Sequence, residues 1–221
     1  MNGKISNAKY RFVIWLLLSL LFGKFLVAIL NEYHFYFPAD FENSSFLIGR
    51  DEHFKGLYWI AFYSHILAGP ITLVGAFFLM MTGGIKRFRF WHRTVGKIAL
   101  GLVLAIIVPS GLVMSTQSLT GPIAGVGFAL TAIFTGISAM FAIWYARQKR
   151  FTLHKIWATR CFIFLCSPIL LRLISSAAFV TSTESDLSYQ LSAWLSWLVP
   201  LAFYEVARHI PKQKLDQELM G

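Results

Sequence analysis

Six long apolar stretches constrain this chain more than any other feature of its sequence. They cover residues 12–30, 57–82, 95–115, 121–146, 156–180 and 188–207. A helix needs roughly 20 apolar residues to cross a hydrocarbon core about 30 Å thick. Because backbone groups find no water in lipid, and the runs are continuous instead of alternating, helices are favoured over a β-barrel. The sequence therefore predicts an all-α polytopic membrane bundle of six transmembrane helices.

The composition excludes most other classes of protein. Hydrophobic residues make up 57% of the 221 residues and charged residues only 14%. This leaves too little polar surface for a water-soluble globule, and too many apolar residues for a disordered chain. The formal net charge of +10 is then a membrane topology signal, so membrane lipids are the expected partners and no nucleic acid is expected.

Lys and Arg collect in segments that share one side of the membrane if six helices alternate. These segments are residues 4–11, 86–93, 147–155 and 208–214. Because short cytoplasmic loops retain basic residues, both termini are predicted to be cytoplasmic, the tail 208–221 included. The aromatic-rich loop 31–56 is expected to lie at the outer interface. Residues 1–221 are expected to form a single transmembrane domain.

Three basic or imidazole side chains are predicted to share a layer in the outer half of the bilayer. Ionisable residues at a helix centre cost about 2.5–3.5 kcal/mol, so each is a candidate for function. At 1.5 Å per residue, Lys24 lies about 9 Å, and His65 and Arg172 about 12 Å, from the outer ends of their helices. The layer is predicted to bind a quinone or another small molecule. The structural alternatives are a snorkelling Lys24 and a neutral His65 bonded to a carbonyl or hydroxyl.

A second polar layer is predicted at the cytoplasmic ends. His92 and Arg93 begin the third helix, His154 begins the fifth with Arg160 about two turns deeper, and Glu205 closes the sixth. Two histidines on separate helices at equal depth are the simplest ligand pair for a haem iron. His92 and His154 are therefore predicted to ligate one haem b, with Arg93 and Arg160 on its propionates. Glu205 is predicted to pair with Arg93 or Arg160, and a solvated interfacial position is the alternative for both histidines.

Other chemistries lack their signatures in this sequence. It contains no HExxH motif, no intramembrane Asp pair, no serine-nucleophile motif, no phosphate-binding glycine loop and no dinucleotide fingerprint. Haem iron is therefore the only metal expected at His92 and His154.

Three segments resemble a bacterial membrane family called domain of unknown function 2306. They are residues 64–69, 91–97 and 154–160, accompanied by Arg172 and Glu205. The resemblance covers roughly residues 57–207 and implies a multi-pass protein of the bacterial inner membrane. One departure is Ala158, where that family usually has Met.

A broader similarity is to six-helix transmembrane cytochromes b, which hold haem on central helices and pass electrons across the membrane. The fourth stretch of this chain has no histidine to pair with His65. The similarity therefore implies at most one haem, from His92 and His154.

Three functions are compatible with these features. The first is a redox protein with one haem near the cytoplasmic side and a quinone or small-acceptor site in the outer half. The second is a binding or transport protein for an anionic or lipid-derived molecule. The third is a structural membrane subunit whose polar residues fix the register of the helices.

Overall fold

The computed structural model describes residues 2–44 and 46–209, and these residues are almost entirely helical. The only strand-like feature in this described part is an isolated bridge between Tyr36 and Ala39. The chain divides into two compact units, residues 1–52 and 53–221. Each unit is described by itself.

The first unit is one long helix followed by a loop of tight turns. Helix α1 (Asn2–Asn31) continues into the 3-10 helix η1 (Glu32–Phe35). The Asp40 carboxylate accepts the backbone N–H groups of Glu42 and Asn43 at 3.0 and 2.9 Å. Such side-chain bonds stabilise a turn because they replace backbone partners. A second 3-10 helix, η2 (Asp51–His53), ends the loop.

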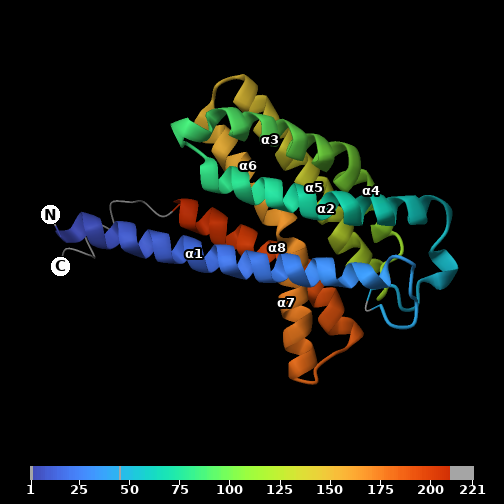
Figure 1. The fold of residues 1–221 in the computed structure, drawn as a ribbon. Coiled ribbons are helices and arrows are strands. Elements are labelled where there is room, and N and C mark those ends of the chain that lie inside the picture. The colour runs from blue at the N-terminus through green and yellow to red at the C-terminus, as the bar shows by residue number, and fades with distance from the viewer. Residues whose placement is uncertain (1, 45, 210–221) are drawn as a thin grey trace. The chain divides into compact units, whose positions relative to one another are not determined.

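The second unit consists of five consecutive helical rods (Figure 1). Their elements are α2 (Gly56–Thr82), the 3-10 turn η3 (Lys86–Phe88), α3 (Arg89–Leu102), the π-helical turn η4 (Val103–Ile107), α4 (Val108–Ser115), α5 (Pro122–Arg147), α6 (Phe151–Leu165), α7 (Ser167–Val180) and α8 (Asp186–His209). The turn η4 joins α3 to α4 in one rod, and α6 and α7 are separated only by Cys166. Helix α5 is central, since it packs against α4, α6 and α8.

Five helices of the described chain are long and apolar enough to cross a membrane. They are Leu16–Phe35, Gly56–Thr82, Lys86–Ser115, Pro122–Arg147 and Phe151–Val180. The all-helical membrane architecture predicted from the sequence is therefore confirmed in its coarse form. Helix α8 has 24 residues but is not among the five, because Gln190 and several serines lower its hydropathy. Its two fully buried serines, Ser192 and Ser196, point away from the surface of the unit.

The two ends of the second unit differ in charge. The end at the connections 83–88 and 148–150, with the end of α8, is called the basic end here. Its exposed cations are Lys86, Arg87, Arg89, Arg93, Arg147, Lys149, Arg150, Lys155 and Arg208. The opposite end, at the connections 116–121 and 181–185, carries the exposed acids Glu184 and Asp186. The sequence predicts this separation of charge, because successive connections lie at alternate ends of the unit and the basic residues occur in every second connection.

Small and aromatic side chains form the interior of the second unit. Val103, Ala139 and Cys161 are almost completely buried and bring η4, α5 and α6 together. Phe134, Phe164 and Trp197 form an aromatic cluster of α5, α6 and α8, with ring centroids 5.8 to 6.1 Å apart. Small residues permit this close approach of helices, which is how membrane bundles pack.

Glycine is required where α4 and α5 meet. A Cβ added to Gly125 would lie 2.7 Å from the backbone oxygen of Ser115, which cannot rotate away. We therefore expect Gly125→Ala to lower the free energy of unfolding by about 1–3 kcal/mol, since the backbone must shift. The measurement is equilibrium unfolding of the detergent-solubilised protein by SDS titration.

Gly101→Ala is the matched control for this prediction. A Cβ at Gly101 meets nothing within 4 Å, and alanine favours a helix by up to about 1 kcal/mol over glycine. Stability should therefore stay the same or rise slightly. Equal losses in the two variants would contradict the steric argument.

Candidate functional site

His92 lies at the basic end, where the last residue of α2 meets the first turn of α3. Its Nδ1 is 3.3 Å from the Thr82 hydroxyl oxygen. That hydroxyl donates its single hydrogen to the Phe78 carbonyl at 2.8 Å, so it can only accept from the imidazole. Nδ1 therefore carries the proton in the neutral ring, and Nε2 keeps its lone pair.

His154 is oriented in the same way by a different element. Its Nδ1 lies 2.9 Å from the Ala142 carbonyl oxygen on α5. A carbonyl oxygen only accepts, so Nδ1 is again the protonated nitrogen and Nε2 keeps its lone pair. Histidines that bind metals are commonly fixed by such a bond from the second ring nitrogen to a backbone carbonyl.

Both histidines lie at the basic end of the second unit. They stand in the first turns of α3 and α6, and both are half-buried. No group of three or more His, Cys, Asp or Glu side chains in the described part of the chain could share a metal ion. The sequence predicts these two imidazoles as haem ligands, and this role stays a prediction.

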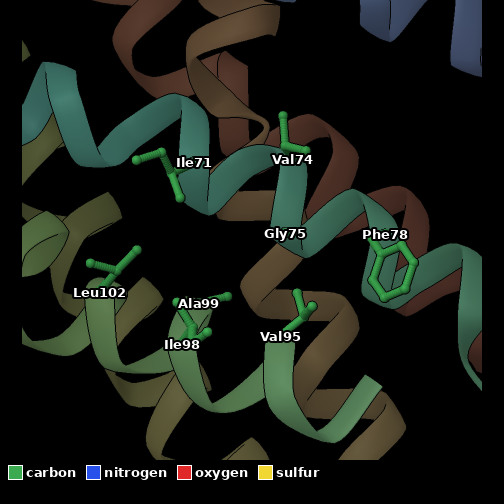
Figure 2. A pocket seen from close by; sticks show the side chains of 8 residues that line it. All are labelled: Ile71, Val74, Gly75, Phe78, Val95, Ile98, Ala99 and Leu102. Carbon is green, nitrogen blue, oxygen red and sulfur yellow. The ribbon is translucent and has the colours of Figure 1, made fainter. Parts of the chain in front are cut away.

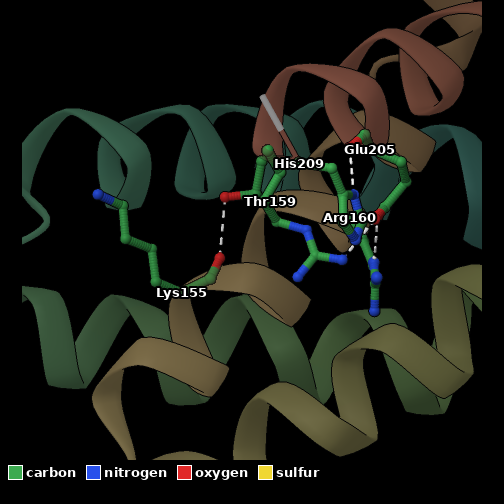
Figure 3. A network of polar contacts seen from close by, with 6 residues as sticks. Lys155, Thr159, Arg160, Glu205 and His209 are labelled. Atoms are coloured by element: carbon green, nitrogen blue, oxygen red, sulfur yellow. Dashed lines mark hydrogen bonds and ion pairs between the residues drawn. The ribbon is translucent and has the colours of Figure 1, made fainter. Parts of the chain in front are cut away.

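Arg160 and Glu205 join α6 to α8 at the basic end. Arg160 Nε lies 2.7 Å from one Glu205 carboxylate oxygen (Figure 3). Arg208 donates to the other oxygen at 2.8 Å. The Arg160 guanidinium also lies 4.4 Å above the centre of the Trp157 ring. Arg160 is thus held between a carboxylate and an aromatic face. Arg93, by contrast, is exposed and has no recorded partner among the described residues.

A separate polar cluster surrounds His65 inside the second unit. The His65 Nδ1 lies 2.9 Å from the Ser110 hydroxyl oxygen on α4, and the ring also approaches the Ile107 carbonyl. Ser110 in turn reaches the Ile106 carbonyl at 2.5 Å. These carbonyls belong to the π-helical turn that precedes Pro109, a residue that has no N–H to offer. The cluster thus gives the Ser110 hydroxyl and the His65 imidazole hydrogen-bond partners inside the bundle.

Arg172 and Lys24 do not share the contacts of His65. Arg172 lies on α7, a helix that packs mainly against α8, and donates to the Pro168 carbonyl at 3.2 Å within its own helix. Lys24 lies on α1, in the first unit. The grouping of these three residues as one ligand site therefore stays a prediction.

The partners of the histidines could not be selected from the sequence. Thr82 and Ala142 belong to no sequence motif. Their role as hydrogen-bond acceptors for the histidines becomes apparent only when another helix packs next to them. Ser110 is the exception, because the pair Pro109 and Ser110 inside an apolar stretch signals a perturbed helix with a local hydroxyl to repair it.

The fold and this polar arrangement define the class of multi-pass helical membrane proteins. Residues 62–207 match the family model described as "Predicted membrane protein (DUF2306)", and the chain belongs to this family. The resemblance predicted from the sequence is therefore confirmed for the family. No curated protein and no solved structure matches the chain. The broader similarity to cytochromes b is thus without support from these comparisons.

The bond between α6 and α8 leads to a prediction for stability. Arg160→Gln should lower the free energy of unfolding by roughly 1.5 kcal/mol, because a charge-assisted bond between two helices is lost. Arg208→Gln removes only a bond within α8 and should cost less than about 0.5 kcal/mol. SDS titration of both variants measures the difference. Equal effects would contradict the view that Arg160 holds α8 to the bundle.

Proposed function

We propose that this chain is an integral membrane redox protein that holds one b-type haem at the basic end. The observation that carries the proposal is the pair His92 and His154, two imidazoles on separate helices whose Nδ1 atoms are both engaged. Their Nε2 atoms then keep lone pairs that are free to bind a metal ion. When bound, a haem supplies one-electron chemistry, and the protein sets its potential through ligands, burial and hydrogen bonds.

The side chains of this chain have separate tasks in the proposal. Thr82 and Ala142 fix the tautomer and the orientation of the two imidazoles. The Trp157 ring packs on Phe141 with centroids 4.5 Å apart and joins α6 to α5. Arg93 is the free cation for a propionate, whereas Arg160 keeps its bond to Glu205 and holds α8 in place.

The proposal includes six crossings of the bacterial inner membrane with both termini cytoplasmic. The charge separation between the two ends of the second unit supports this orientation, since basic loops stay in the cytoplasm. The buried serines of α8 support a sixth crossing, because they direct the polar face of that helix into the bundle. The haem would then lie near the cytoplasmic side.

An absorbance spectrum of protein purified from haem-replete cells tests the proposal. We expect a Soret band that is lost in His92→Ala and in His154→Ala, because each variant lacks one of the two imidazoles that would hold the haem. His53→Ala is the matched control, since His53 is an exposed histidine outside the pair, and it should keep the band. A colourless parent protein, or a band that survives both substitutions, would contradict the proposal.

A second candidate function is the binding or transport of an anionic or lipid-derived molecule at a site in the outer half of the bilayer. The π-helical turn beside His65 favours it, because such turns occur frequently at functional sites. For this function, His65 is proposed to contribute to the site. The same site would bind a quinone or another small acceptor if the redox function holds.

Thermal stabilisation by laurate distinguishes the second candidate from the first. We expect laurate to raise the melting temperature of the parent and of His53→Phe, but not of His65→Phe, if His65 lies in a carboxylate site. Equal shifts in both variants would remove this candidate and would leave the test of the haem unaffected.

A further inference from the structure

An apolar groove follows the contact between α2 and α3 on the surface of the second unit. Two adjoining cavities of about 290 and 330 Å³ form it, and both are lined by Phe78 and Val95. The first cavity opens at the basic end between Phe88 and Trp91. The second continues along the helices to Ile71 and Leu102. Every lining residue other than Gly75 has an apolar side chain.

Small residues give the groove its shape. A Cβ on Gly75 would lie 3.4 Å from the Ala99 Cβ, so the two helices approach closely there and close the floor. Larger side chains, such as those of Ile71, Phe78 and Leu102, form the walls (Figure 2). The groove is therefore an open apolar depression between α2 and α3.

The length of the groove matches one leaflet of a bilayer. Trp91 at its mouth and Leu102 at its far end are separated by eleven positions of one helical rod, or about 16 Å at 1.5 Å per residue. Half of a hydrocarbon core about 30 Å thick is about 15 Å. The groove is thus long enough to hold an acyl chain across the full thickness of the leaflet at the basic end.

Positive charge surrounds the mouth without a counterion from the bundle. Lys86, Arg87 and Arg89 are exposed next to Phe88. The sequence has no Asp or Glu between Glu52 and Glu184. At the basic end of the described chain, the one carboxylate is that of Glu205, and Arg160 and Arg208 already occupy both of its oxygens. The cations at the mouth are therefore available to an external anion.

We propose that this groove binds one acyl chain of an anionic phospholipid whose phosphate is held by Arg87 and Arg89. The apolar walls select a lipid chain, and the cations at the mouth select a negative head group. A second copy of this protein would bury the walls but would bring the same positive charge to the mouth. The charge thus favours a lipid as the occupant.

Native mass spectrometry of the full chain released from detergent tests the proposal with phosphatidylglycerol and phosphatidylcholine as probes. We expect the parent to bind one phosphatidylglycerol in preference to phosphatidylcholine. Arg87→Gln/Arg89→Gln should weaken the binding of phosphatidylglycerol by about tenfold or more and leave phosphatidylcholine unchanged. Both arginines are exposed, so this variant does not depend on repacking.

Matched variants separate the groove from general effects of charge and bulk. Arg147→Gln/Arg150→Gln removes the same charge at the same end, outside the groove, and should keep the affinity of the parent. Ile71→Trp fills the groove and should weaken the binding of both lipids. Ile60→Trp is its control, because Ile60 lies three turns away on the same face of α2 and is exposed to a similar extent, 57% against 61%.

Three results would overturn the proposal. The first is an equal loss of phosphatidylglycerol binding in the two double Gln variants, which would indicate an unspecific effect of charge. The second is unchanged lipid binding in Ile71→Trp. The third is a dimer in the parent that Ile71→Trp dissociates, because a second copy would then occupy the groove. None of these results bears on the Soret band.

Discussion

The lack of water in a hydrocarbon core is the constraint on which this structure depends. A polar group inside a membrane-spanning helix must find its partner within the protein. Some buried hydroxyls meet this demand by donating to carbonyls of their own helix, as Thr72 does to Ala68 at 2.7 Å and Thr135 does to Thr131 at 2.6 Å. The buried Ser196 hydroxyl on α8 has no such partner. Beside the π-helical turn η4, a partner comes from a neighbouring helix, because the Ser110 hydroxyl is bonded to His65 on α2.

The cluster around His65 shows how one local defect organises several elements. Pro109 interrupts the regular bonding of its rod, and the π-helical turn η4 absorbs the interruption. Ser110 and His65 then bind the turn from α4 and α2. The same rule accounts for the pair at the basic end, where a Thr82 hydroxyl and an Ala142 carbonyl orient His92 and His154. In both places the imidazole is oriented by a group on another element.

The sequence predicts much of the architecture because hydropathy and charge act along the chain. The apolar stretches 57–82 and 121–146 correspond closely to α2 and α5, whose bounds are Gly56–Thr82 and Pro122–Arg147. The spans predicted to begin at residues 95 and 156 start too late, because amphipathic first turns lower the local hydropathy. In the structure α3 begins at Arg89 and α6 at Phe151, which places His92 and His154 inside helices. The bond between Arg160 and Glu205 follows one of the two pairings that the sequence left open.

Length, hydropathy and the placement of Lys and Arg determined by themselves that this chain is a helical membrane protein with one strongly basic end. They do so because the bilayer imposes a fixed thickness and a charge rule on any sequence. Only the tertiary structure decided which polar groups meet, since rotation of each helix about its axis sets which side chains face inward. That rotation is fixed by close contacts of small residues such as Gly75 and Ala99, and such contacts leave no periodic signal in an almost uniformly apolar helix.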